Sequence, residues 1–239
     1  MNDMEKLIAE KIDKEKKKTE YFSQFALKHL SAMRILEKGG VLGEDNKEWR
    51  NVAEHCLVAA VGADILAEHL NADRDTVVLA TFLHDWYKRR EVEAIREHGG
   101  EKGVTKTVQE DDRLLREYGF SEEFIRVAHA NMPVSADPEY IAGRSRNEKI
   151  VHFMDHITLG SEYVEVKDRW RELEKEPFFK AYSESYRGIY GGKNLKEFQK
   201  ELAESEEEEF EHKIELSPGT IVEFIRTELE KRINAKEDR

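Results

Sequence analysis

The sequence of 239 residues holds a single cysteine, Cys56, and only four prolines. One cysteine cannot form a disulfide within the chain, which favours a reducing compartment and predicts a cytoplasmic protein. Residues 1–6 lack the apolar stretch of a signal peptide. A run of about 18 apolar residues, the length that a membrane helix needs, is also missing. We therefore expect a protein without a membrane span.

Positive charge is scarce relative to negative charge, since 39 lysines and arginines stand against 51 aspartates and glutamates, for a net charge of −12. An acidic chain is a poor partner for the nucleic-acid backbone, so we do not expect nucleic-acid binding to be its main task. A small phosphorylated substrate remains compatible, because a local basic site can form on an acidic protein. The few prolines and the many strong helix formers predict a mostly helical protein.

Apolar residues recur at intervals of three and four along several segments, which predicts an all-α fold because this spacing gives each helix one apolar face. Helices are expected over residues 3–37, with a break near residues 14–18, and over residues 47–70. Residues 194–213 indicate a charged helix with a solvated acidic run, and Ser217 is expected to cap a last helix. The sequence shows no convincing strand pattern and no internal repeat.

A short apolar stretch, residues 77–83, leads directly into the pair His84-Asp85. Its length and composition indicate a buried helix. An ionised aspartate that is buried without a partner is costly, or its pKa shifts until it is neutral. A divalent metal ion removes this cost, because histidine and aspartate are both good ligands for zinc, iron and manganese. The alternative is a helix end that turns to solvent, and the dipeptide alone does not decide between the two.

Asp155 presents the same problem further along the chain, at the centre of the apolar segment 150–157. Such an acid is expected either to bind a metal or to form a salt bridge, for which Arg144 or Arg146 is available. His55 flanks the apolar seam of the expected helix 47–70 and points toward the edge of the core. A lone histidine in that position is usually structural, but together with the acids it favours a metal site.

These four positions occur in the order His55, His84-Asp85 and Asp155, and the pattern resembles the HD superfamily of metal-dependent phosphohydrolases. The segments 51–55 and 80–85 are similar to the first and second ligand helices of that family. The resemblance covers roughly residues 47–160. It implies an all-α helical bundle in which the metal lies between helices.

The resemblance also implies one or two divalent transition metal ions, either iron, manganese, zinc, cobalt or nickel. The first ion would be held by His55, His84, Asp85 and Asp155, and the second by Asp85 as a bridge, His98 and His129. Members with two metals carry extra histidines in the interval where His98 and His129 stand, as in the dinucleoside-polyphosphate hydrolase-like and HD-GYP-like subgroups. Ala130 replaces a further histidine, and a Gly-Tyr-Pro element is missing, which puts cyclic-dinucleotide hydrolysis in doubt.

Lys88 completes a His-Asp-x-x-Lys pattern that is frequent in these subgroups. On a continuous helix it would lie almost one turn beyond Asp85 and on nearly the same face. A lysine there can contact a substrate phosphate as a point charge, so Asp85 and Lys88 are the expected catalytic residues. Weaker candidates for phosphate contact are Arg144, Arg146 and Lys149. The alternative for Lys88 is an ordinary lysine at a helix end.

The function implied by the resemblance is hydrolysis of a phosphate ester or anhydride of a nucleotide-like small molecule by a metal-bound hydroxide. Two alternatives stay open, namely an HD-type di-iron oxygenase acting on a small polyol or phosphonate, and a non-catalytic HD module that senses a ligand. We expect residues 1–40 to form a helix packed on the core and residues 41–170 to form the metal-binding domain. Residues 171–239 would be a helical extension that acts as a lid or as an oligomer surface, which leaves a homodimer open.

Overall fold

A computed structural model of the chain describes residues 3–43, 48–98, 100–132, 136–175, 179–184, 186–188 and 190–235, with side chains except at residues 3–12, 100–105, 181 and 182. The prediction of an all-α fold is confirmed. The helices are α1 (Asp3–Lys28), α2 (Leu30–Lys38), α3 (Arg50–His69), α4 (Arg74–Leu83), α5 (Lys88–His98), α6 (Gly100–Glu117), α7 (Glu122–Ala128), α8 (Pro138–Ala142), α9 (Arg146–Ile157), α10 (Val166–Leu173), α11 (Phe179–Glu184), α12 (Leu195–Lys213) and α13 (Ile221–Asn234).

Three local expectations need correction. The helix α1 runs unbroken through residues 14–18 and ends only at Lys28, before His29. A short antiparallel hairpin, β1 (Thr158–Leu159) and β2 (Glu162–Tyr163), follows α9 although the sequence shows no strand pattern, because strands this short leave no measurable alternation. The last helix starts at Ile221 rather than after Ser217, and the carboxylate of Glu211 accepts the backbone N–H groups of residues 219–221 in place of a serine cap.

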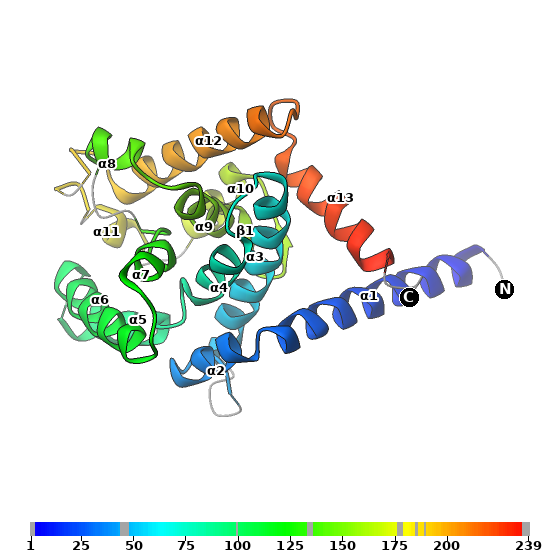
Figure 1. The fold of residues 1–239 in the computed structure, drawn as a ribbon, viewed down its shortest axis with the longest axis horizontal. Helices are drawn as coiled ribbons and strands as arrows, with labels where there is room; N and C mark the ends of the chain where they lie inside the picture. The colour runs from blue at the N-terminus through cyan, green and yellow to red at the C-terminus, as the bar shows by residue number, and fades with distance from the viewer. Residues whose placement is uncertain are drawn as a thin grey trace.

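The centre of the fold is formed by α3, α4 and α9, which pack against one another. Figure 1 shows α3 and α4 in the middle of the molecule with the other helices around them. The helix α3 is buried along most of its length, from Ala53 to Ala67, because small and branched apolar residues occupy nearly all of its faces. The helix α4 is buried from Val77 to Leu83 apart from Leu79, as its apolar sequence predicts. These helices carry the residues that the sequence pattern singled out.

The helices α10, α12 and α13 come from the carboxyl-terminal part of the chain and pack over the central helices. The helix α12 packs on α9 and α10 and runs along the top of Figure 1, whereas α13 packs on α3. The acidic run of α12 is not fully solvated as expected. Its first member, Glu206, is buried, forms an ion pair with Arg144 and shares a hydrogen bond with the neutral ring of His152. Burial raises the pKa of Glu206, and the charge of Arg144 offsets part of this effect.

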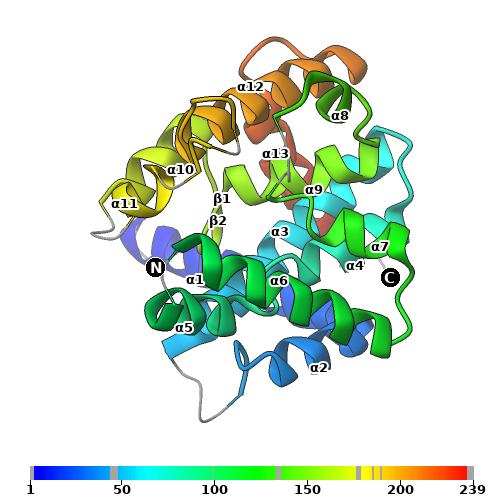
Figure 2. The same ribbon diagram turned by 90° about the vertical axis from the view of Figure 1, so that its left-hand side faces the viewer.

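The helices α5 and α6 form a pair that lies beside α7 at one side of the molecule (Figure 2). Trp86, which is buried just before α5, donates an indole hydrogen bond of 2.7 Å to Asp111 on α6. Gly39 lies so close to the backbone of Trp86 that an added Cβ would be 1.9 Å from its carbonyl oxygen. The turn at residues 84–87 is therefore tightly confined from two sides.

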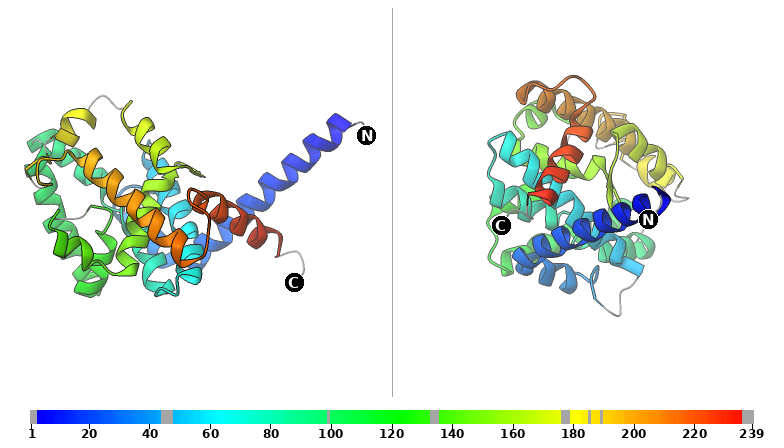
Figure 3. Two further views of the ribbon diagram at one scale, coloured as in Figure 1. Left: turned by 90° about the horizontal axis from the view of Figure 1, so that it is seen from above. Right: turned by 90° about the vertical axis from the view of Figure 1, so that its right-hand side faces the viewer.

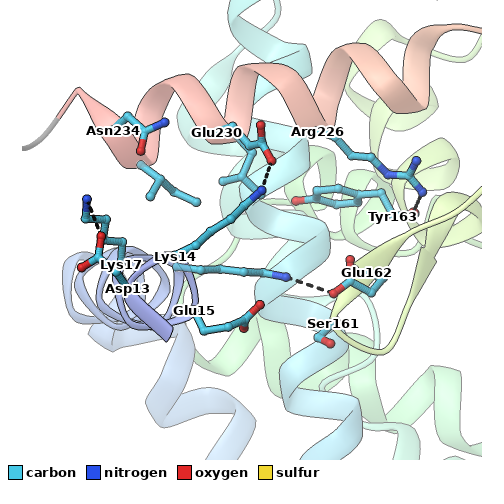
Figure 4. A pocket seen from close by; sticks show the side chains of 13 residues that line it. Asp13, Lys14, Glu15, Lys17, Ser161, Glu162, Tyr163, Arg226, Glu230 and Asn234 are labelled. Carbon is cyan, nitrogen blue, oxygen red and sulfur yellow. Dashed lines mark hydrogen bonds and ion pairs between the residues drawn. The ribbon is translucent and has the colours of Figure 1, made fainter. Parts of the chain in front are cut away.

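The amino-terminal part of α1 projects away from the rest of the molecule (Figure 3). A groove of about 510 Å³ lies between α1, the hairpin and α13. The Nζ atom of Lys14 lies 2.6 Å from the carboxylate of Glu230, a pair that Figure 4 shows. The Nζ atom of Lys18 lies 3.0 Å from the carboxylate of Glu162. These pairs connect α1 to α13 and to the hairpin, so the charged side chains of the groove serve to hold these elements together. Among the described helices, none is long and apolar enough to cross a membrane.

Candidate metal centre

The four residues of the predicted first metal site come together in space. His55 lies near the start of α3, His84 and Asp85 follow the end of α4, and Asp155 lies near the end of α9. Because these three helices pack against one another, residues that are up to 100 positions apart meet at one point. One ligand atom from each of the four residues lies within 4.8 Å of the others.

The distances inside this group are short. The Nε2 atom of His55 lies 3.0 Å from Oδ1 of Asp155 and 3.2 Å from Nε2 of His84. The Nε2 atom of His84 lies 3.6 Å from Oδ1 of Asp155 and 3.8 Å from Oδ2 of Asp85. Both histidines are at most 7 % exposed and the side chains of Asp85 and Asp155 are 17 % and 18 % exposed, so solvent screens the charges of the group only weakly.

The tautomer of His84 leaves its Nε2 atom free to bind a cation. The Nδ1 atom of His84 donates a hydrogen bond of 2.7 Å to the backbone oxygen of Thr81, which leaves the lone pair of Nε2 directed at the other ligands. Two imidazole nitrogens and two carboxylates then converge with few donors among them. This is the donor set that zinc, iron and manganese bind, so the residues present fit a divalent metal ion.

The charges around the group follow from burial and proximity. Burial opposes protonation of His84, but the charges of Asp85 and Asp155 outweigh it and raise the pKa of His84 to about 9. Burial lowers the pKa of His55. The pKa of Asp155 lies well below its usual range, because its hydrogen bonds to His55 and His84 outweigh the effect of burial. Without a metal, a proton on His84 therefore partly neutralises the two acids.

This raised pKa predicts that metal affinity depends on pH. The metal must displace the proton of His84, so its apparent affinity should rise by up to about tenfold per pH unit at pH values below the pKa of about 9 and level off above it. The stability that protonated His84 gives to the metal-free fold changes with pH in the opposite direction, because it falls as the pH rises. It is complete below the unfolded pKa of about 6.5 and is lost as the pH rises through about 9. Competition with a chelator across this range measures the affinity, and an affinity that stays constant would contradict the assignment of His84.

Two cations border the group. The Nζ atom of Lys88 lies 3.7 Å from Oδ1 of Asp85 and 3.1 Å from Glu91. Lys88 does not continue the helix of Asp85 as expected, because α4 ends at Leu83 and Lys88 opens α5 after the turn. Even so, the sharp turn brings its ammonium group to the predicted side of Asp85.

The second cation, Arg169, was not predicted from the sequence. Its Nη2 atom lies 3.8 Å from Oδ1 of Asp155. Asp155 thus has an arginine beside it, but it is neither Arg144 nor Arg146. The signal that could have found it is weak, since Arg169 follows the buried Val166 by three positions and therefore shares the inward side of α10.

The two histidines expected at a second metal ion lie outside the group of four. His129 follows α7 and pairs with two acids of α6, with Nε2 at 3.2 Å from Asp111 and Nδ1 at 3.4 Å from Asp112. His98 ends α5, and its Nε2 accepts a hydrogen bond of 3.1 Å from Lys106. A second ion held by Asp85, His98 and His129 stays a prediction, and binding it would require these contacts to change.

The three weaker phosphate candidates face other partners. Arg144 is buried and pairs with Glu206, and its Nη2 donates to the backbone oxygens of residues 130 and 148. Arg146 donates to the backbone oxygens of residues 70 and 71 at the end of α3. Lys149 pairs with Glu209 at 2.7 Å. None of the three is among the described residues that line the cavities beside the four ligands.

Comparison with known proteins agrees with this geometry. Residues 52–160 match the family model of the HD domain. No match was found among curated proteins or among solved structures. The matched range contains all four residues of the group, whereas Arg169 and α12 lie beyond it. The match supports placing residues 52–160 of this chain in the HD superfamily, with a cluster of histidines and aspartates that could hold a metal ion.

Proposed function

We propose that this protein is a metal-dependent phosphohydrolase that cleaves a phosphate ester or anhydride of a nucleotide-like small molecule. The observation that carries the proposal is the pair of cations, Lys88 and Arg169, each within 4 Å of a carboxylate in a group that fits a metal. Positive charge on two sides of such a group suits an anionic substrate, and a phosphoryl group is the anion on which HD-type metal centres commonly act.

A divalent ion held by His55, His84, Asp85 and Asp155 would polarise a phosphoryl oxygen and lower the pKa of water. The residues of the chain supply the rest. Lys88 and Arg169 orient the phosphoryl group by charge, and Lys88 also opposes the negative charge that develops on the leaving oxygen.

The di-iron oxygenase is the less supported alternative. That chemistry uses two irons and a set of six ligands, and four of the six candidate residues come together among the described residues. A non-catalytic sensor is also less supported, because a sensor has no need to bury two acids beside two histidines. Consumption of oxygen by iron-loaded protein would favour the oxygenase, and ligand binding without turnover would favour the sensor.

The test is phosphate release by metal-loaded protein from a panel of nucleotides and simple phosphoesters. We expect turnover that a chelator abolishes and that added manganese, zinc or iron restores. The matched control is Asp155→Asn, which keeps the shape of the side chain but removes its charge and should lose turnover with the metal. Fully loaded protein that hydrolyses no member of the panel would contradict the proposal.

A further inference from the structure

The metal group lies where two cavities meet. Asp85, Lys88, Arg169 and Leu173 line both of them. The smaller cavity has a volume of about 180 Å³ and extends between α5, α10 and α12. The larger has a volume of about 390 Å³ and opens between α3, α10 and the turn of the hairpin. A phosphoryl group held between Lys88 and Arg169 would therefore have space on two sides.

Beyond the charged residues the smaller cavity is mostly apolar, with Asn131, His156 and Gln199 as the polar members of its lining. Its wall consists mainly of Val92, Ile95, Met132, Trp170, Phe179 and Leu195. Trp170 is fixed within this wall because its ring packs between His156 and Phe179, with centroid distances of 5.3 and 5.9 Å. An engineered apolar cavity of about 150 Å³ is known to hold one benzene molecule, so this space fits a single ring or a short alkyl group. A whole nucleoside is too large for it.

The larger cavity has a different character. Polar and charged side chains line its outer part, among them Asn51, Glu172 and Lys175. Lys175 pairs with Glu172 at 2.6 Å, so this rim is a hydrated, mixed-charge surface. Its volume falls in the range of about 300–1,000 Å³ that is usual for sites binding small organic molecules. A polar group such as a nucleoside suits this side of the metal group.

We infer that the substrate carries an organic group on each side of its phosphoryl group, as in a phosphodiester or a doubly substituted phosphoanhydride. The smaller, apolar group enters the cavity beside Trp170, and the larger, polar group enters the cavity beside Asn51. This inference rests on the proposed function and narrows its substrate class. For a diester, water bonds to phosphorus, one ester P–O bond breaks, and the departing oxygen takes a proton from that water. The products are a phosphomonoester and an alcohol.

The test compares three monoanions of equal charge on metal-loaded protein, namely dimethyl, methyl phenyl and diphenyl phosphate. Calorimetry should show an affinity gain of about tenfold for each added ring, since one ring is buried in the smaller cavity and the other lies against Val52, Leu159 and Leu173 inside the polar rim of the larger one. Equal affinities of methyl phenyl and diphenyl phosphate would overturn the inference, because only one cavity would then hold an organic group.

Variants assign each ring to its cavity. Val92→Phe fills the smaller cavity and Asn51→Trp narrows the larger one, so each should remove the gain from one ring and the double variant should remove both. Ile95→Phe repeats the first test if Val92→Phe folds poorly, with metal content and thermal unfolding as checks. A gain of diphenyl over dimethyl phosphate that stays at about 100-fold in Val92→Phe also overturns the inference, because filling the smaller cavity should reduce it to about tenfold.

Failure of the inference and failure of the proposed function give different results. Hydrolysis of phosphomonoesters with equal affinities for one and two rings would leave the function standing and reject the two-sided substrate. The expected pattern of ring affinities without any phosphoester hydrolysis would support the two-sided site and reject the hydrolase.

Discussion

Lys88→Met is expected to lower kcat on a phosphate substrate by about 100- to 1000-fold, equivalent to about 3–4 kcal/mol, without changing metal content. Methionine keeps the length of the lysine stem but removes the charged ammonium group. The ammonium group lies 3.7 Å from Asp85, and it borders both cavities. A fixed cation there stabilises the charge of the transition state more than that of the bound substrate, so kcat changes more than KM.

Lys149→Met provides the matched control. Lys149 was also a candidate for phosphate contact, but its ammonium group pairs with Glu209 on α12. Its replacement should change kcat by less than about threefold, as expected for a surface pair. Steady-state kinetics on both variants measures the contribution of Lys88 to turnover. Wild-type turnover of Lys88→Met would show that Lys88 is not a catalytic residue.

Glu206→Ala is expected to destabilise the fold by about 3–5 kcal/mol, the usual effect of breaking a buried ion pair. The side chains of Glu206 and Arg144 are 3 % and 1 % exposed. Arginine cannot shed its proton, so the variant leaves a buried positive charge with only backbone oxygens as partners. His152 loses a hydrogen-bond partner as well.

The control lies one helical turn away on the same face of α12. Glu209 pairs with Lys149 and Lys213, and its side chain is 31 % exposed. Because water screens this pair, Glu209→Ala should cost less than about 1 kcal/mol. Urea unfolding of the two variants measures the difference directly. Equal losses of stability would show that burial of Glu206 does not matter.

Three of the four candidate metal ligands could be predicted from the sequence because they are chemically out of place where they stand, and His55 followed from its order relative to them. Asp155 interrupts an apolar helix, and His84-Asp85 ends an apolar run, so the cost of burying charge points to a partner. The residues around them could not be predicted in the same way. Glu206 lies in an acidic run that looks solvated, and Arg169 lies in a charged helix. Only the packing of α12 and α10 against α9 shows that both face inward.

Local signals fixed helix positions better than helix ends. Asp73 and Ser121 cap α4 and α7 by accepting hydrogen bonds from the backbone N–H groups of Thr76 and Phe124, as short polar side chains directly before an apolar helix commonly do. The start of α13 was missed because its cap comes from Glu211, whose carboxylate reaches it across a turn. The turn after Leu83 was missed because an apolar pattern does not show where a helix stops when the following residues are also buried.

The most direct test of the metal centre is the metal content of protein purified without a chelator. Plasma mass spectrometry should find about one or two divalent transition metal ions per chain in the wild type. His84→Ala and Asp155→Ala should lose the ion bound by the group of four. His29→Ala should keep it, because that histidine packs against Phe25 and Phe82 instead. A wild type without transition metal, or full metal content in His84→Ala and Asp155→Ala, would contradict the account.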